Sequence, residues 1–308
     1  MPFRVIIHQG IAFMSSKLLG IDVGTGGTRA VLIDEAGTVV ASCTAEHAPF
    51  ASPETGWAEQ DPHDWWRATR EAVKQVMATS KTNSSEIAAV GFSGQMHGAV
   101  LLDDKSDVLR PALIWCDQRS APEADELTAE IGGEKIIGWT CNPALPNFTL
   151  TKLLWVRKHE PHLFERFRML LLPKDYVRYR LSGEYGMDMA DASGTLLLDV
   201  AHRRWSSEMS GAAGIPMNAL PPLFESPDVC ASVSRAGAEA TGLREGTPLV
   251  AGAGDQAAGA VGLGIVRAGA VHATIGTSGV VFAATDRPAL DPKGRLHTFC
   301  HAIPERWH

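Results

Sequence analysis

The stretch LLGIDVGTGGTRAVLI, residues 18–33, contains two apolar runs joined by a glycine-rich turn. The first run carries Asp22 near its end, and the turn is Gly24-Thr25-Gly26-Gly27. Glycines let successive backbone N–H groups point at one anion, so this turn is a candidate phosphate site. The sixth position counted from Gly24 is Arg29, and no Gly-Lys-Ser/Thr follows. These two facts exclude the dinucleotide fingerprint and the Walker P-loop.

The residues after this turn indicate strands. A turn at Asp34–Gly37 separates the second apolar run from another β-forming run at Thr38–Ala41. The order strand, turn, strand, turn, strand predicts an antiparallel meander.

A second copy of the hairpin pattern lies far downstream, in AVHATIGTSGVVFAA at residues 270–284. Gly276-Thr277-Ser278-Gly279 matches the first turn, and Thr274 stands where the first copy has Asp22. A repeat at this distance indicates a duplicated domain in which each half supplies one phosphate hairpin. Two unrelated glycine hairpins are the alternative.

The composition of the 308 residues is that of a globular protein with a large core, at 45% hydrophobic and 20% charged. A net charge of −7 and the lack of a basic run give no indication of nucleic-acid binding. The five cysteines show no CxxC spacing, which favours a reducing, cytoplasmic setting over disulfides or zinc. Residues 1–16 are too short and too polar to be a membrane span, and we expect them to be an N-terminal extension. Met14, within it, is the expected natural start.

A helix is expected to begin after Asp61 and to run to about Ser80. Asp61 is a good N-cap and Pro62 suits the first helical position. Apolar residues then recur at helical spacing and predict one buried face. They are Trp65, Trp66, Ala72, Val73 and Val76.

Two loops that follow strands carry candidate binding residues. Gln95-Met96-His97, flanked by glycines, follows a strand at Ile87–Phe92; an apolar Met beside a polar His suits a sugar, although a lone loop histidine is often structural. Trp115 ends a strand that begins at Pro111 and could stack on a sugar face. Asp117 and Arg119 after it could bond a substrate, or could pair with each other and hold the loop.

The middle of the chain is predicted to contain a Pro-rich loop at Thr140–Asn147, a helix from Phe148 to Pro161, a strand at Met169–Leu172, and a helix that opens at Pro173 and stops at Gly183. Asp188, Asp191 and Asp199 are spaced along the next segment. They suit either a metal site or local turns.

Asp255 lies between a buried strand at Gly246–Gly252 and a small-residue helix. A carboxylate in this position is a good N-cap. It is also where ligand sites of α/β proteins lie, at the carboxyl end of a strand. The sequence pattern leaves both roles open.

Together these motifs resemble one family, the FGGY carbohydrate kinases of the actin-like superfamily, and within it the members that act on xylulose. The motifs that carry the resemblance run in family order from Leu18 to His308. They are Gly20–Thr25, Glu59–Pro62, Gly94–Gly98, Leu172–Tyr176, Asp191–Thr195, Gly254–Gly259 and Gly276–Gly279.

The resemblance implies ATP-dependent phosphorylation of the xylulose 5-hydroxyl, with Asp255 as the general base. It further implies that a sugar pocket is formed by Met96, His97, Trp115, Asn147 and Gln256. Asp22 would hold Mg²⁺, an ion that prefers oxygen ligands. The ATP phosphates would lie on the two hairpins, at Gly24, Thr25, Gly26, Gly27, Thr28, Arg29, Gly276, Thr277 and Ser278. A homodimer is left open.

The implied fold is α/β, with an actin-like (ribonuclease H-like) mixed sheet flanked by helices. A sugar-binding N-terminal domain would cover residues 17–267, and residues 268–308 would be the truncated start of a similar second domain that continues further in family members. One departure stands out: relatives often have Trp-Asn-Asp where this chain has Trp115-Cys116-Asp117. If that Asn faces the sugar, affinity or sugar choice differs here. Another pentulose or polyol kinase of the same family is one alternative. A truncated sugar-binding module without kinase activity is the alternative from another class.

Overall fold

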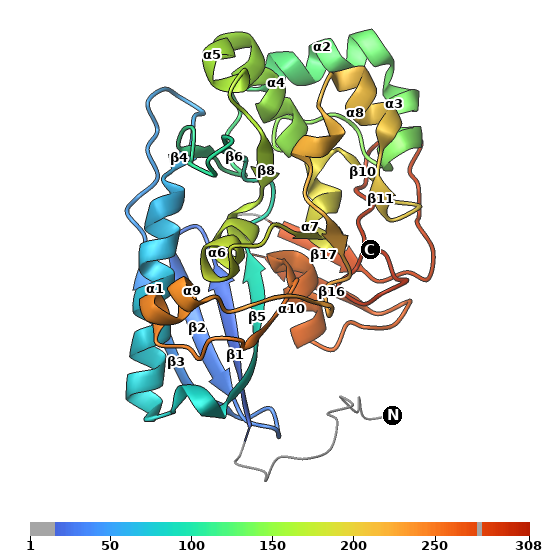
Figure 1. Cartoon of the computed structure of the whole chain (residues 1–308). Coiled ribbons are helices and arrows are strands. Elements are labelled where there is room, and N and C mark those ends of the chain that lie inside the picture. The colour runs from blue at the N-terminus through green and yellow to red at the C-terminus, as the bar shows by residue number, and fades with distance from the viewer. Residues whose placement is uncertain (1–15, 276–278) are drawn as a thin grey trace.

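The computed structural model of the chain describes residues 16–275 and 279–308 (Figure 1). Its centre is a seven-stranded mixed sheet in the order β13-β14-β5-β1-β2-β3, with β15 also paired to β5. These strands are β1 (Lys17–Val23), β2 (Gly27–Ile33), β3 (Val39–Glu46), β5 (Ile87–Gly94), β13 (Val229–Ser232), β14 (Pro248–Val250) and β15 (Ala253–Gly254).

The predicted meander is confirmed. β1 and β2 pair antiparallel from Leu18 opposite Ile33 to Val23 opposite Thr28, and β2 continues antiparallel to β3. The glycine-rich turn therefore joins two long, fully paired strands, which hold its two ends in a fixed position.

The other side of β1 has a different geometry. β5 runs parallel to β1, and both β14 and β15 run parallel to β5. Parallel neighbours end at the same edge of a sheet, and that edge is where ligands of open α/β sheets bind.

Helix α1 (Pro62–Ser80) begins and ends where the sequence predicts. The Asp61 carboxylate accepts the His63 N–H at 2.9 Å, and Lys81, with φ of 53°, closes the helix in the left-handed region. The expected apolar face of α1 is buried against the sheet. Together with α6 (Pro173–Ser182) and α9 (Arg235–Thr241), α1 covers one face of the sheet (Figure 1).

The remaining elements surround this core. The helices are α2 (Ala121–Ile131), α3 (Gly133–Thr140), α4 (Thr149–His159), α5 (Pro161–Phe164), α7 (Met189–Ala192), α8 (Ser207–Ala213) and α10 (Asp255–Gly262), with 3₁₀ turns at Ser84–Glu86, Ser193–Thr195 and Met217–Ala219. The short strands are β4 (Glu59–Gln60), β6 (Val100–Leu102), β7 (Ala112–Leu113), β8 (Met169–Leu171), β9 (Met187–Asp188), β10 (Leu198–Asp199), β11 (Arg204–Trp205) and β12 (Leu223–Phe224).

One local prediction needs correction, and one helix was not predicted. The strand expected over Pro111–Trp115 is only β7, because the chain turns after it, with the Asp117 N–H donated to the Ile114 carbonyl. Helix α3 was not predicted, since Gly133 and Gly138 lower its helix propensity and no side chain caps it.

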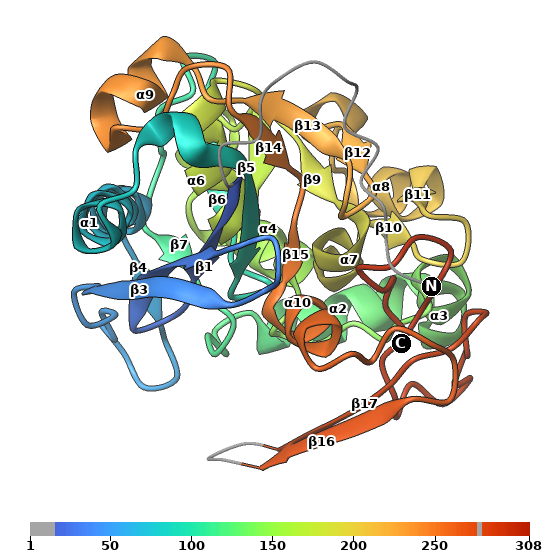
Figure 2. The same cartoon turned by 90° about the horizontal axis from the view of Figure 1, so that it is seen from below.

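The second predicted hairpin is also antiparallel. β16 (Val271–Ile275) pairs with β17 (Gly279–Ala283), and Figure 2 shows the pair projecting away from the seven-stranded sheet. Ile275 and Val281 are exposed. Gly276, Thr277 and Ser278, to which the sequence assigns phosphate contacts, lie outside the described residues, as do residues 1–15 of the expected N-terminal extension.

The Asp61 cap gives a stability prediction. Asp61→Ala should lower the free energy of unfolding by about 1 kcal/mol, because it leaves an N-terminal N–H of α1 without its acceptor. Urea denaturation measures this loss, and Asp104→Ala, at an exposed turn, is the control that should change stability little. Equal stability of the Asp61 variant and the parent would contradict the capping role.

Candidate active site

The candidate site lies where three parallel strands end together. Val23 of β1 is in register with Gly94 of β5, and Gly94 is in register with Gly254 of β15. Asp22, the loop that begins at Gln95, and Asp255 therefore meet at one edge of the sheet. The sequence assigned these side chains to the metal, the sugar and the base. Asp22 and Asp255 are more than 200 residues apart in the chain.

Asp255 is the first residue of α10, directly after β15. Its side chain reaches the open side of the edge, yet the protein around it removes enough water to raise the pKa of the carboxyl to about 6. The negative charge of Asp22 adds to this rise, and hydrogen bonding to Gln256 opposes it. The carboxylate can therefore accept a proton near neutral pH.

The first hairpin presents free donors at its tip. The Gly24 N–H is donated to the Gly27 carbonyl at 3.1 Å and closes the turn. Within the described part of the chain, the N–H groups of Thr25 and Gly26 donate to no protein atom. Two adjacent unpaired N–H groups on a tight turn form an anion-binding nest.

Two buried glutamines hold this turn from below. Gln60 donates from Nε2 to the Thr25 carbonyl at 2.7 Å, and Gln95 donates from Nε2 to Gln60 Oε1 at 2.9 Å. The Thr25 hydroxyl donates to Gln95 Oε1 at 3.3 Å and accepts the Trp115 indole N–H at 3.0 Å. The network connects the hairpin to both loops that carry the candidate sugar residues.

Thr28 and Arg29 point elsewhere. Thr28 is fully buried, and its hydroxyl bonds His47 Nε2 at 2.9 Å while His47 Nδ1 faces the Thr25 carbonyl at 3.4 Å. Burial lowers the pKa of His47, so the ring is neutral at pH 7. Arg29 is exposed on β2 and donates to Thr44 at 3.2 Å.

His97 adopts a left-handed backbone conformation, with φ of 65°. Its Nδ1 lies 2.7 Å from the Gly194 carbonyl, which only accepts, so Nδ1 carries the proton and Nε2 is free to accept one. Burial lowers the pKa of His97 to about 3 and keeps the ring neutral. A Cβ at Gly194 would stand 2.7 Å from Nδ1, so the close approach requires glycine there.

The other candidate sugar residues come from separate segments. Met96 packs against Gly254, the residue before Asp255, where a Cβ would lie 2.6 Å from Met96 Cγ. Trp115 is 43% exposed and offers a ring face to solvent. Asn147 and Gln256 are half-buried.

Asp117 and Arg119 pair with each other, as one of the two sequence interpretations holds. The Arg119 guanidinium donates to both Asp117 oxygens at 2.7–3.0 Å, and both side chains are buried. Arg119 also lies over the Trp57 ring at 3.7 Å from its centroid. This pair fixes the loop after Trp115.

The carboxylates of Asp188 and Asp191 surround an amine. Lys174 Nζ lies 2.7 Å from Asp175, 2.5 Å from Asp188 and 3.2 Å from Asp191, all of them buried. Burial alone would lower the pKa of Lys174, but these carboxylates raise it, whereas burial raises the pKa of Asp191. Among the described residues no cluster of three His, Cys, Asp or Glu side chains suits a metal ion. Asp199 lies apart, beside His202.

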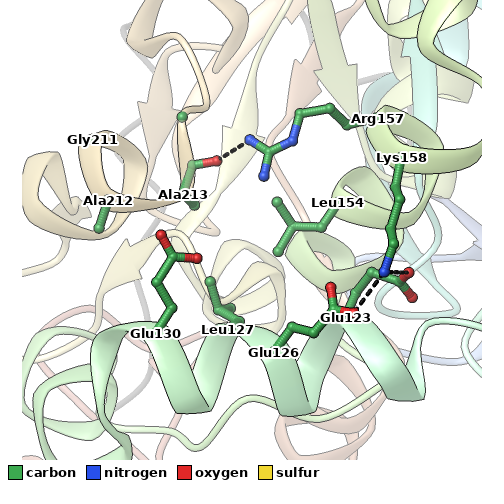
Figure 3. A pocket seen from close by; sticks show the side chains of 11 residues that line it. Glu123, Glu126, Leu127, Glu130, Leu154, Arg157, Lys158, Gly211, Ala212 and Ala213 are labelled. Atoms are coloured by element: carbon green, nitrogen blue, oxygen red, sulfur yellow. Dashed lines mark hydrogen bonds and ion pairs between the residues drawn. The ribbon is translucent and has the colours of Figure 1, made fainter.

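A surface pocket of about 530 Å³ lies away from this edge, between α2, α4 and the end of α8 (Figure 3). Arg157 on one wall donates to the Ala213 carbonyl, and Lys158 pairs with Glu126. None of the candidate site residues lines it.

Sequence reasoning missed several residues that shape the site. Phe148 packs edge-on against the His97 ring at 5.2 Å between centroids, and Phe299 lies 6.3 Å from it. Lys152 is fully buried in the first turns of α4. The one sign of this role in the sequence is a charged residue directly before the apolar run LLWV of a predicted helix.

The family to which this arrangement belongs is established by comparison. The N-terminal domain of the FGGY family of carbohydrate kinases matches residues 17–262, so the chain belongs to that family. Its actin-like mixed sheet is therefore the fold that the sequence predicts.

The chain is similar to xylulose kinases. Among its relatives, the chain is 44% identical to "Xylulose kinase" of Escherichia coli (strain K12) and 40% identical to that of Bacillus subtilis (strain 168), over 94% of this chain. The crystal structure of xylulose kinase from Rhodospirillum rubrum superposes with a TM-score of 0.90 at 32% identity, over 94% of this chain and 59% of that one.

The chain spans 59% and 58% of the length of the two curated relatives. Over the described residues, no helix has the length and apolarity needed to cross a membrane.

The buried Lys174 gives a second stability prediction. Lys174→Met should lower the free energy of unfolding by about 3–5 kcal/mol, because it leaves buried Asp188 and Asp191 without their cation, whereas Asp175 keeps Arg178. Urea denaturation is the measurement, with Lys135→Met on the surface of α3 as the control. A loss of less than about 1 kcal/mol would contradict this role of Lys174. It would show that the carboxyl groups are protonated and do not need a cation.

Proposed function

We propose that this chain is the sugar-binding part of an ATP-dependent kinase that phosphorylates D-xylulose at its 5-hydroxyl. Residues 17–267 form the N-terminal domain, and residues 268–308 begin the second. The observation that carries the proposal is the convergence of Asp22, the nest at Thr25 and Gly26, and Asp255 at one sheet edge. The similarity to xylulose kinases supports the choice of sugar.

Asp255 is the general base in this proposal. Its carboxylate takes the proton from the 5-hydroxyl as that oxygen attacks the γ-phosphorus of ATP. The bond from the γ-phosphorus to the bridging oxygen breaks, and ADP leaves with that oxygen and its electron pair. A loose phosphoryl-transfer transition state depends mainly on positioning and charge neutralisation, so the proton leaves late and a pKa near 6 is sufficient.

The sugar is held by polar and apolar contacts. His97 offers Nε2 as an acceptor for a sugar hydroxyl, because Nδ1 is committed to Gly194. Met96 and the exposed ring of Trp115 contact the C–H faces, and the amides of Asn147 and Gln256 offer both donors and acceptors. A pocket of this composition suits a ligand that has both hydroxyls and apolar faces.

The phosphates are held by the hairpins. The N–H groups of Thr25 and Gly26 bind phosphate oxygens, with Gly24 and Gly27 in the same turn. Gly276, Thr277 and Ser278 stay assigned to the phosphates by the resemblance alone, whereas Thr28 and Arg29 bond His47 and Thr44 and do not contact the phosphates directly. Buried Thr28 acts through His47, which supports the turn from inside.

Asp22 lies close enough to Asp255 for its negative charge to raise the pKa of the Asp255 carboxyl. One or two carboxylates together with phosphate oxygens are a typical donor set for Mg²⁺, so the residues present fit this ion. Bound beside Asp22, Mg²⁺ would neutralise charge on the ATP phosphates. Asp22 itself lies at the carboxyl end of β1, next to the nest.

Calorimetric titration of the 308-residue chain with xylulose and with ATP–Mg²⁺ tests the proposal, together with coupled detection of ADP. We expect xylulose to bind, and to bind more tightly than other pentuloses and polyols. Binding of xylulose without ATP would favour a sugar-binding module, preference for another sugar would favour a different kinase of the family, and no binding of any sugar would refute the proposal.

Replacing the base should separate turnover from binding. Asp255→Asn should reduce kcat by about 10²–10⁴-fold, because the amide cannot accept the proton, while the xylulose Kd changes much less. At saturating xylulose, kcat of the parent should rise as pH increases through about 6 and then level off, since the carboxyl must be ionised to act.

Glu245→Gln is the matched control, since it removes an exposed carboxylate outside the site and should leave both constants unchanged. Near-normal turnover in Asp255→Asn would exclude Asp255 as the base.

A further inference from the structure

Lys152 is a fully buried lysine in the first turns of α4. Its Nζ donates to the carbonyl of His97 at 2.9 Å and to the carbonyl of Asn147 at 2.7 Å. The two carbonyls belong to loops 50 residues apart in sequence, each of which carries a residue of the proposed sugar pocket. One ammonium group thus ties these loops together.

The charge on Lys152 has no close counter-charge among the described residues. Asp117 acts on it only through space and is itself bonded to Arg119. Lysine side chains point back toward the N-terminus of a helix, where the helix dipole disfavours a cation. A buried and uncompensated charge is expensive for folding, so folding alone does not explain a lysine at this position.

A clamp for the two loops needs donors, and an ammonium supplies charge-assisted ones. Hydrogen bonds from a charged donor are roughly twice as strong as neutral ones. The bond to the His97 carbonyl also helps to hold a residue whose φ of 65° is rarely populated. His97 in turn directs its Nε2 by bonding Gly194.

We propose that Lys152 is the positioning residue of the sugar pocket, which holds the loops of His97 and Asn147 in the arrangement that the sugar binds. This inference rests on the proposed function, because it assumes that His97 and Asn147 contact the sugar. Lys152 acts through these two residues and is not assigned a contact with the ligand.

The proposal has a consequence for protonation. Burial lowers the pKa of Lys152 to about 7, so the amine titrates in the neutral range. The groups whose charges act on Lys152 or feel its charge are His97, Cys116, Asp117 and Arg119. His97 stays neutral, burial raises the pKa of Cys116, and Asp117 and Arg119 form their own pair, so Lys152 is the member expected to titrate near pH 7.

The sign of the effect follows from linkage. The ammonium form holds both carbonyls more strongly than the neutral amine does, and the sugar binds the clamped arrangement. Sugar binding should therefore raise the pKa of Lys152, and the chain should take up part of a proton when the sugar binds at about pH 7.5. The same linkage weakens sugar binding by several-fold as pH rises from about 6.5 to 8.5.

Calorimetry of the 308-residue chain with xylulose, in two buffers of different ionisation enthalpy at pH 7.5, measures this proton uptake. We expect uptake in the parent and none in Lys152→Met, whose xylulose Kd should also be weaker by about tenfold or more. Lys158→Met on the exposed side of the same helix is the matched control and should keep both the uptake and the affinity of the parent.

Absence of proton uptake in the parent overturns the inference, and this measurement does not depend on any variant folding. Uptake that persists in a folded Lys152→Met overturns it as well, since another group would then titrate. Urea unfolding and circular dichroism of the variant show whether it folds; Lys152→Gln, which keeps a neutral donor, is the second variant if it does not.

The two proposals fail in different ways. If the parent binds another sugar of the panel instead of xylulose, the proposed substrate is wrong, and the same uptake experiment with that sugar decides the role of Lys152. If no sugar binds, both proposals fall. If xylulose binds without a change in protonation, the proposed function stands and the role of Lys152 does not.

Discussion

The parallel pairing of β5 with β1 on one side and with β14 and β15 on the other is the constraint on which the site depends. Parallel strands place their carboxyl ends at one edge, so three short loops distant in sequence meet there. The antiparallel pairing of β1 with β2 returns the chain at once through the glycine turn. The anion nest and the carboxylates therefore lie at the same edge.

The glutamine network makes this edge rigid. Gln60 and Gln95 are buried and bonded to each other, to Thr25 and, through Gln60, to the indole N–H of Trp65 in α1. A buried polar network that satisfies its members fixes one arrangement, because any other arrangement would leave polar groups unpaired. The turn is thus held in one shape by the protein itself, which would reduce the ordering needed to bind the phosphates of the proposed function.

The sequence predicts features that depend on neighbouring residues. α1 follows from Asp61 and the apolar spacing, α6 ends at Gly183 as expected, and Asp255 lies between a strand and a helix. These signals act over a few residues. That β1, β5 and β15 end at one edge of the sheet could be expected only from the family resemblance, because strand order depends on contacts across the whole chain.

The features that the sequence did not predict depend on distant partners. Thr28 has the same local surroundings whether its hydroxyl faces a phosphate or His47, and only the folded meander brings His47 beneath it. The spacing of Asp188 and Asp191 is equally compatible with a metal, and the amine that occupies their centre comes from α6. In each case the deciding atom lies well beyond the reach of a local pattern.

The two buried lysines show how charge is used differently in one core. Lys174 is surrounded by three carboxylates and bonds within a closed cluster beneath the site, so its charge is compensated and serves the fold. Lys152 has only carbonyl partners, although Asp117 lies near enough to affect its pKa. Arg119 and the Ala58 N–H take up the Asp117 oxygens, so the ammonium has no carboxylate bonded to it. A compensated charge keeps its proton over the whole physiological range, whereas an uncompensated one responds to small changes around it. The arrangement thus leaves the group beside the sugar pocket responsive to binding, and keeps the group beneath the catalytic strand ends fixed.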